Sequence, residues 1–320
     1  MASAGRDWNF NVTAIPDAPL YAVVKQITSR GLKLPASSGV IMRFISEVEE
    51  SYEDHPYHSS THAADAVNSV WVLLTSLQKK NKVLTQADMF VGLISAAIHD
   101  VGHRGVSNNF LIHSSDELAV RYNDLHVLEN FHLATAFTIA REGERCNIFE
   151  TCNVVTYEEL RKSIISVVFA TDLADHFSYV SGLRNTFRNL TAESSVDDIK
   201  KVTGQILVGA MLCADLGHGS KPFLLHEMWS AKIAEEFYMQ GDLEVTMQRE
   251  VSPLCLRGEG AVAFNASQVG FLKFLVMPLF DVMKGVMPAE VFSDITENIR
   301  VNIKQWLEKK DEEKLVISHK

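Results

Sequence analysis

Apolar residues recur at helical spacing along most of this 320-residue chain, and this pattern limits the fold more than any other feature. The clearest case follows His62, where one apolar stripe is made of Ala66, Val70, Leu73 and Leu77. Alternating patterns typical of strands are scarce, and proline numbers only 8, which suits long helices. The sequence therefore predicts an all-α protein.

The same patterns predict how the chain is organised. Residues 1–19 are polar, carry two prolines and predict an irregular lead-in, whereas residues 20–320 are expected to form a single domain. Two stretches, 142–156 and 252–267, contain glycine and mixed polar residues and predict loops. Beyond the stretch from His62, the helix candidates are 37–50, 85–98, 124–141, 157–170, 197–213, 222–239, 267–284 and the segment around 292–306.

Charge and cysteine usage narrow the class of partner and the compartment. A net charge of −10 argues against nucleic-acid or anionic-membrane partners. Four cysteines without a CxxC pair argue against a disulfide framework, and the longest apolar runs are too short to span a bilayer. We therefore expect a cytoplasmic domain without membrane contact, in which a metal would supply any positive charge that an anionic substrate needs.

His58 and His62 are four residues apart and would share one face if this stretch is helical. That face continues into the apolar stripe, so both imidazoles would point inward, where they need hydrogen-bond partners or a metal. Taken alone, an HxxxH pair is weak evidence, because a structural or surface pair is the commoner reading of so short a motif.

Three apolar runs end in an acidic residue. The run Met89–Ile98 leads into His99-Asp100, and two further runs lead into Asp215 and into Thr171-Asp172. A carboxylate at the C-terminal end of a helix is unfavourable unless a cation lies nearby. Together with an inward histidine pair, these ends predict a common cation site, and two His and two Asp ligands suit a catalytic site.

Six sequence blocks, in this order between about Tyr52 and Trp306, resemble the catalytic domain of class I 3′,5′-cyclic nucleotide phosphodiesterases, which belong to the HD-type metal phosphohydrolases. The blocks are YHSSTHAAD, HDVGHRGVSNNFLI, YNDLHVLEN, ATD, CADLGH and SQVGF. The resemblance implies an all-helical domain of three packed subdomains with the site at their junction. It also implies hydrolysis of the 3′ phosphoester bond of cyclic AMP, cyclic GMP or both to the 5′-monophosphate, which terminates cyclic-nucleotide signalling.

The resemblance also implies roles for individual residues. Zn²⁺ would be held by His62, His99, Asp100 and Asp215, with Asp100 bridging to a second metal, Mg²⁺ or Mn²⁺. The waters of the second metal would be held by His103, Glu129 and Thr171. A hydroxide activated by both metals would be the nucleophile, and His58 would be the general acid. From the residues alone, either Asp65 or Glu129 could orient His58.

A second set of residues would bind the substrate. Gln268 would hydrogen-bond the purine and Phe271 would stack on it, while Ile233 and Phe237 would line the other side of the slot. Without the resemblance, Phe271 reads more readily as core and Gln268 as a surface amide. Asn108 would lie beside the metal cluster.

The chain departs from the family pattern at two places. Gly102 stands where the family usually carries Asp, and His218-Gly219 stands where it often carries Asn-Pro. His218 would lie near the purine pocket, so the choice between cyclic AMP and cyclic GMP stays open. Regulatory domains are expected outside this chain, and a homodimer is compatible with it.

Two alternatives to this function remain. One is another HD-type phosphohydrolase that acts on nucleotides or dinucleotides. The other is an inactive nucleotide-binding or scaffold module, which would be expected to lose a metal ligand or the general acid. The four candidate metal ligands and the candidate general acid, His58, are all present.

Overall fold

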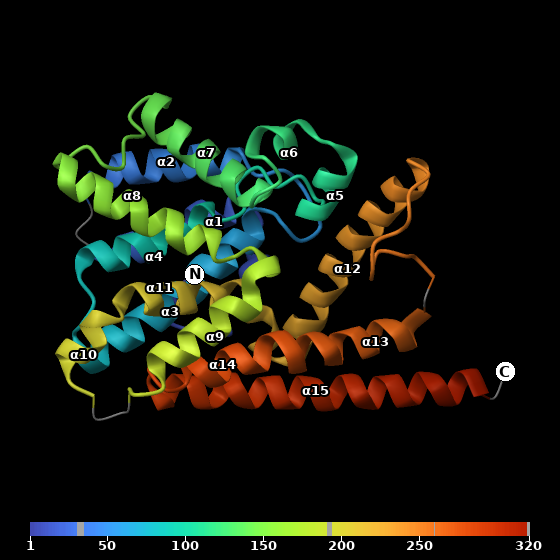
Figure 1. Cartoon of the computed structure of the whole chain (residues 1–320). Helices are drawn as coiled ribbons and strands as arrows, with labels where there is room; N and C mark the ends of the chain where they lie inside the picture. Colours follow the sequence, from blue (N-terminus) through green and yellow to red (C-terminus); the bar gives the residue numbers. More distant parts are fainter. Residues whose placement is uncertain (31–34, 191–193, 259, 319–320) are drawn as a thin grey trace.

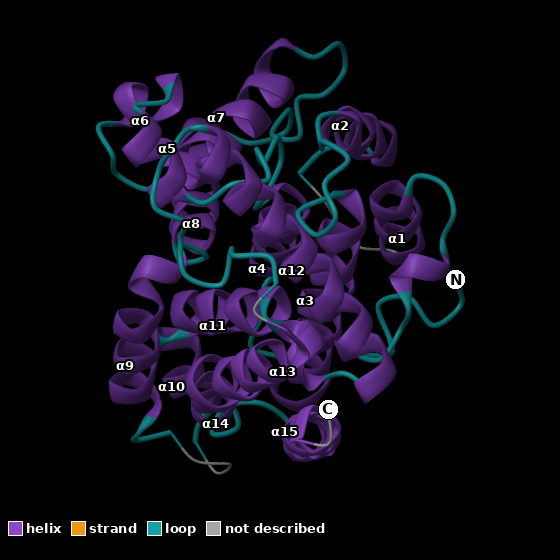
Figure 2. Ribbon diagram, turned by 90° about the vertical axis from the view of Figure 1, so that its right-hand side faces the viewer, coloured by secondary structure: helices purple, strands orange, loops and turns teal. Residues whose placement is uncertain are grey.

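The computed structural model describes residues 1–30, 35–190, 194–258 and 260–318, and these residues form only helices and loops (Figures 1 and 2). The all-α prediction is therefore confirmed. In chain order the elements are η1 (Val12–Ala14), α1 (Pro19–Thr28), α2 (Ser38–Glu50), α3 (Ser60–Asn81), α4 (Gln86–Ile98), α5 (Asn108–Ser114), α6 (Glu117–Tyr122), α7 (Val127–Glu142), α8 (Val154–Phe169), η2 (Leu173–Asp175), α9 (His176–Phe187), α10 (Val196–Lys201), α11 (Thr203–Asp215), η3 (Gly217–Ser220), α12 (Phe223–Thr246), α13 (Gly260–Phe271), η4 (Leu272–Val276), α14 (Met277–Met283) and α15 (Ala289–Ser318).

Several predicted helices differ in their limits. The candidate 197–213 is two helices, because Val202 leaves the helical conformation at φ −111° and ψ 14°. The candidate 267–284 begins earlier, at Gly260, inside a stretch predicted as loop, and it contains the π-helical segment η4. Pro278 follows this segment and has no N–H to donate to the preceding turn, which favours a local change of helical pitch.

The lead-in packs against the core although it is mostly irregular. Before α1 it contains only the short helix η1, and Ala4, Trp8 and Val12 are buried. The Trp8 Nε1–H donates to Ser220 Oγ at 3.1 Å, which attaches the lead-in to the turn that follows α11.

Two helices, α4 and α11, are buried on all sides. Every residue of Met89–Ile98 and of Ile206–Ala214 is buried, as expected for helices that are apolar all round. α3 approaches α4 so closely that a Cβ on Gly92 would lie 2.4 Å from Leu74 Cδ1. The two buried helices therefore carry the residues at their C-terminal ends into the interior of the protein.

The buried apolar residues form one large cluster and one small one. The large cluster extends along the chain from Ala4 to Trp306. The small cluster joins α5, α6 and the start of α7, and it includes Phe110, Leu118 and Leu128. One stretch of the described residues, Gly260–Met283, is long and apolar enough to cross a membrane, and it packs against α15.

The last helix, α15, fixes the turn that follows α11. Asn302 Nδ2 donates to the carbonyl oxygens of Gly219 and Lys221, at 3.0 and 2.8 Å. Asn298 Nδ2 donates to the Ser220 carbonyl at 3.0 Å. A helix some 80 residues away in sequence therefore holds η3 in place, and with it the chain beside Asp215.

Candidate active site

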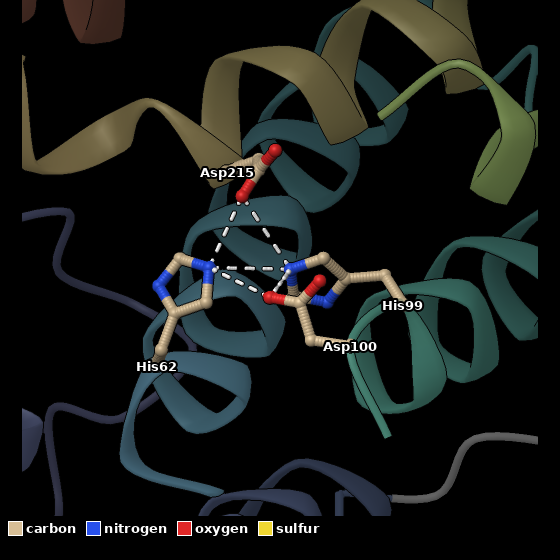
Figure 3. Close-up of side chains that lie close together, drawn as sticks. All are labelled: His62, His99, Asp100 and Asp215. Carbon is tan, nitrogen blue, oxygen red and sulfur yellow. Dashed lines mark hydrogen bonds and ion pairs between the residues drawn. The ribbon is translucent and has the colours of Figure 1, made fainter. Parts of the chain in front are cut away.

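Four side chains from three helices meet at one point (Figure 3). His62 lies in the first turn of α3, His99 and Asp100 follow α4, and Asp215 is the last residue of α11. His62 Nε2 lies 3.1 Å from Asp215 Oδ1 and 3.2 Å from His99 Nε2, and His99 Nε2 lies 3.1 Å from Asp100 Oδ2. The structure thus brings together the four residues that the sequence predicted as metal ligands.

The spacing of these atoms suits a tetrahedral cation site. A tetrahedron with ligand bonds of zinc length has edges of about 3.3 Å. His99 Nδ1–H donates to the Ala96 carbonyl at 3.0 Å, so the lone pair of neutral His99 lies on Nε2 and faces the cluster. Asp100 Oδ2 is buried and accepts no hydrogen bond. A buried carboxylate oxygen without a donor and an imidazole lone pair aimed at one point fit a bound metal ion.

The cluster also attracts positive charge. Burial opposes the charged form of His99, yet the carboxylates of Asp100 and Asp215 outweigh it and hold the pKa of His99 well above its usual value. Burial likewise opposes the ionised form of Asp100, but the neighbouring histidines, His99 foremost, hold its pKa well below the usual value. The position between these side chains therefore favours a cation.

His58 lies just outside the helix on which it was expected. Helix α3 begins at Ser60, so His58 precedes it, but its ring still lies 6.0 Å from that of His62, at 82°. The ring of His58 also stacks on that of His103, with centroids 3.9 Å apart.

Glu236 on α12 holds His58, and the sequence did not reveal this. Glu236 Oε1 contacts His58 Nδ1, and Oε2 accepts the backbone N–H groups of Tyr57 and His58 at 2.9 and 3.0 Å. Burial opposes the charged form of His58, but Glu236 raises its pKa to about 9, and the pKa of Glu236 falls to about 2. With a pKa of about 9 the ring of His58 is charged at neutral pH, and Glu236 engages only its Nδ1.

Neither acid proposed to orient His58 from the sequence does so. Asp65 instead pairs with the Lys221 ammonium, and both side chains are buried. Glu129 is engaged by Asn108, whose Nδ2 donates to its Oε2 at 3.0 Å. Glu236 could not be distinguished from its neighbour Glu235 in the sequence, yet Glu235 lies on the surface and pairs with Arg257.

The buried pair of Asp65 and Lys221 leads to a stability prediction. Asp65→Ala would leave the ammonium buried without its partner, so we expect the free energy of unfolding in urea to fall by about 3–5 kcal/mol. The double variant Asp65→Ala/Lys221→Met removes both charges and should recover much of this loss. A single variant as stable as the wild type would contradict the assigned pair.

Asp172 and Glu129 form a second acidic group, apart from the four candidate ligands. Asp172 was predicted to join the common cation site, but its Oδ2 accepts from His126 Nδ1 at 2.8 Å and lies 3.5 Å from Asn108 Nδ2. Burial, together with the charge of Asp172, raises the pKa of Glu129 to about 7. Asn108 thus lies between two carboxylates, and the prediction that Asp172 joins the common cation site was wrong, because Asp172 groups with His126 and Glu129 instead.

His103 and Thr171, which were also expected to hold water, make different hydrogen bonds. His103 Nδ1 accepts the Gly105 N–H at 3.0 Å, and burial together with His58 holds the pKa of His103 well below its usual value. The neutral ring therefore presents Nε2–H. The Thr171 hydroxyl donates to the Val168 carbonyl at 2.8 Å, at the end of α8.

His132, which the sequence did not single out, also lies beside the four ligands. Its Nδ1–H donates to the Val101 carbonyl at 2.8 Å, and its Nε2 lies 3.9 Å from Asp100 Oδ1. Burial lowers the pKa of His132 to about 4, so the ring is neutral. The second oxygen of Asp100 therefore faces an uncharged imidazole.

The residues expected to bind the purine fall into two groups. Gln268, Ile233 and Phe237 line a cavity of about 40 Å³ between α12 and α13, and Gln268 Nε2 donates to Ser267 Oγ at 3.4 Å. Phe271 is not part of this lining, and its ring lies parallel to that of His218, with centroids 5.3 Å apart.

The two departures from the family pattern have separate structural settings. Gly102 has φ +73°, a left-handed conformation that favours glycine, in the turn between Asp100 and His103. His218 Nδ1 lies 3.1 Å from His226 Nδ1, and Trp306 Nε1 donates to His226 Nε2 at 2.8 Å. His218 thus contacts His226 on α12, and Trp306 on α15 holds His226 in turn.

Comparisons with known proteins agree with this geometry. The profile of the 3′5′-cyclic nucleotide phosphodiesterase family matches residues 57–299. A Drosophila melanogaster 3′,5′-cyclic-AMP phosphodiesterase, isoform F, is 36% identical over 265 residues, which cover 82% of this chain and 39% of that protein. The Rattus norvegicus 3′,5′-cyclic-AMP phosphodiesterase 4C is 33% identical over 297 residues, which cover 86% of this chain and 52% of that protein. The chain thus spans about half or less of the length of these relatives.

A solved structure shares the whole fold. The phosphodiesterase domain of the Salpingoeca rosetta rhodopsin phosphodiesterase superposes with a TM-score of 0.88 at 26% identity, covering 99% of this chain and 95% of that one. The matched range, 57–299, spans His58, the four candidate metal ligands, Glu236 and Gln268. The chain belongs to the 3′,5′-cyclic nucleotide phosphodiesterase family.

Proposed function

We propose that this chain hydrolyses the 3′ phosphoester bond of cyclic AMP, cyclic GMP or both to the 5′-monophosphate, and so terminates cyclic-nucleotide signalling. Cyclic AMP is the substrate named for the Drosophila and rat relatives. The observation that carries the proposal is the pairing of two groups: four converging ligands with an unsatisfied carboxylate oxygen, and beside them a histidine that a buried glutamate keeps protonated.

The four ligands would hold Zn²⁺, and Asp100 would also serve a second metal, Mg²⁺ or Mn²⁺, whose waters His103, Glu129 and Thr171 would hold. Bound metals would supply Lewis acidity toward the phosphate and a water of lowered pKa. Glu129 and His103 offer an acceptor and a donor that can orient water there. Net local positive charge would then draw an anionic phosphate into a protein whose overall charge is −10.

His58 would give its Nε2 proton to O3′ as the ring phosphoester bond breaks. Glu236 contributes twice, because it orients the imidazole through Nδ1 and keeps the ring charged at neutral pH. Gln268, Phe271, Ile233 and Phe237 would hold the base, with His218 next to Phe271. An amide such as Gln268 can present a donor and an acceptor to adenine or to guanine.

The test is turnover of cyclic AMP and cyclic GMP in competition, because discrimination is a ratio of specificity constants. Metal content is measured on the same sample, and nucleoside triphosphates and dinucleotides serve as further substrates. We expect hydrolysis of a cyclic nucleotide only. Turnover of the triphosphates instead would favour another HD-type phosphohydrolase, and bound metal without any turnover would favour a binding module.

Glu236→Gln should change the pH profile of this reaction. His58 must be protonated to act, so activity is lost as the pH rises through its pKa of about 9. Removing the negative charge of Glu236 should move this alkaline limb down by roughly 1–2 pH units. The matched control is Glu235→Gln, which alters the adjacent surface glutamate and should leave the profile unchanged. An alkaline limb at the same pH in both variants would exclude Glu236 as the partner of His58.

A further inference from the structure

A large cavity lies away from the four metal ligands, between the C-terminal end of α7 and the N-terminal end of α8. It has a volume of about 680 Å³, which is within the range of small-molecule sites. The loop 143–153, which joins the two helices, closes one side and lies at the edge of the molecule in Figure 1. We call this space the α7–α8 cavity; its lining includes Phe137, Thr138, Arg141, Phe149, Tyr157 and Arg161.

Three aromatic rings form one side of the α7–α8 cavity. The rings of Phe137 and Phe149 are nearly parallel, at 29° with centroids 6.3 Å apart, and Tyr157 meets Phe149 edge-on at 5.2 Å. Each ring comes from a different segment, namely α7, the joining loop and α8. Phe149 is only 7% exposed and also packs against Phe90, so Tyr157, which is 38% exposed, offers the aromatic surface on which a flat ring would stack.

The charged residues in the lining are both arginines. Arg161 lies over the ring of Phe137, with its guanidinium carbon 3.8 Å from the ring centroid. No ion pair or hydrogen bond of Arg161 occurs within the described residues, so its N–H edge is available to a ligand. Arg141 pairs only with the exposed Glu142 within that same part of the chain.

No carboxylate belongs to the lining formed by the described residues, although the chain carries 40 acidic residues and a net charge of −10. Local positive charge in such a protein is complementary to an anion. A guanidinium edge donates two parallel hydrogen bonds to a phosphate or a carboxylate, and two arginines suit a dianion. The α7–α8 cavity thus combines stacking surface with an anion site.

We propose that the α7–α8 cavity binds a planar aromatic dianion of the nucleoside monophosphate class. The base would stack on Tyr157, beside the Arg161 guanidinium that covers Phe137, and the phosphate would pair with the N–H edge of Arg161 and with Arg141. This site is separate from the four metal ligands. Helix α8 has 16 residues and so a length of about 24 Å, and its other end leads to Thr171 and Asp172.

The two helices that form the cavity also carry the second acidic group, Glu129 and Asp172, at their other ends. Glu129 lies in the first turn of α7, and Asp172 follows the last turn of α8. A ligand that bridges the opposite ends of these two helices would restrict their movement relative to each other. It would thereby act on the spacing of Glu129 and Asp172 without touching either residue.

The test is photolabelling of the full chain with 8-azidoadenosine 5′-monophosphate, followed by mapping of the labelled peptides. We expect saturable labelling within residues 134–161. Arg161→Gln should weaken it at least about tenfold, the loss expected for a charge-assisted hydrogen bond to phosphate. Arg141→Gln alters a side chain that is 76% exposed, so it cannot disturb the core, and it should weaken labelling in the same direction.

Two controls separate this site from the catalytic one. Arg184→Gln makes the same change at an exposed arginine on α9 and should leave the labelling intact. Asp215→Ala should leave labelling of residues 134–161 unchanged, whether or not the chain hydrolyses cyclic nucleotides. The proposal is overturned if this segment labels without saturation, if Arg161→Gln and Arg141→Gln both label like the wild type, or if adenosine competes as well as adenosine 5′-monophosphate.

Discussion

Asp215→Ala is expected to remove bound metal and hydrolytic activity together. Asp215 Oδ1 lies 3.1 Å from His62 Nε2 and 3.4 Å from His99 Nε2, so its loss opens one side of the ligand cluster. Bound metals contribute several kcal/mol to this type of chemistry, so we expect turnover to fall by about a thousandfold or more. Metal analysis of purified protein and an assay on cyclic AMP and cyclic GMP measure both effects.

The matched control for this variant is Asp197→Ala, which removes a carboxylate that is 84% exposed at the start of α10. It should keep both metal and activity. If Asp215→Ala retains zinc at the wild-type level, then Asp215 is not a ligand. If it loses metal but keeps turnover, then the metals do not take part in the reaction.

His58→Ala is expected to reduce turnover strongly while leaving the metal in place. The His58 side chain reaches Glu236 and stacks on His103, and it is not one of the four converging ligands. Loss of a general acid lowers the rate by about 10²–10⁴-fold. Because the missing proton is needed only by a poor leaving group, a substrate analogue with a more acidic leaving group should recover part of the lost rate.

His113→Ala serves as the control for the histidine change, because His113 is exposed on α5. Its turnover should equal that of the wild type. A His58→Ala protein with unchanged turnover would exclude the general-acid role. One that loses its metal would show instead that His58 supports the ligand cluster.

Much of the fold could be predicted because its signals are local. Helices α2 and α4 begin and end within one residue of the predicted limits, since their caps and periodic apolar residues are all contained in the segment itself. The errors occur where local signals are weak. Helix α15 continues to Ser318 because its last residues include many helix-forming Glu and Lys, whereas α12 continues to Thr246 through the buried residues Gln240, Gly241 and Glu244.

The candidate site, like the fold, could be predicted from the sequence only in part. Two apolar runs followed by acidic residues predicted a buried cation site, and the four candidate ligands do meet there. The same rule was wrong for Asp172, although it follows an apolar run just as Asp215 does. Which buried helix ends share one point depends on how the helices cross, and the periodicity of each helix does not contain that information.

The sequence by itself therefore determined the helical class, the buried helices and the four side chains that converge. Only the tertiary structure showed the partners of the residues around them: Glu236 for His58, Lys221 for Asp65, and His126 and Asn108 for the second acidic group of Asp172 and Glu129. The reason is distance along the chain, since His58 and Glu236 are separated by 178 residues. A pairing of this kind follows from the packing of whole helices. The sequence does not distinguish Glu235 from Glu236, and they differ only because α12 turns Glu236 inward.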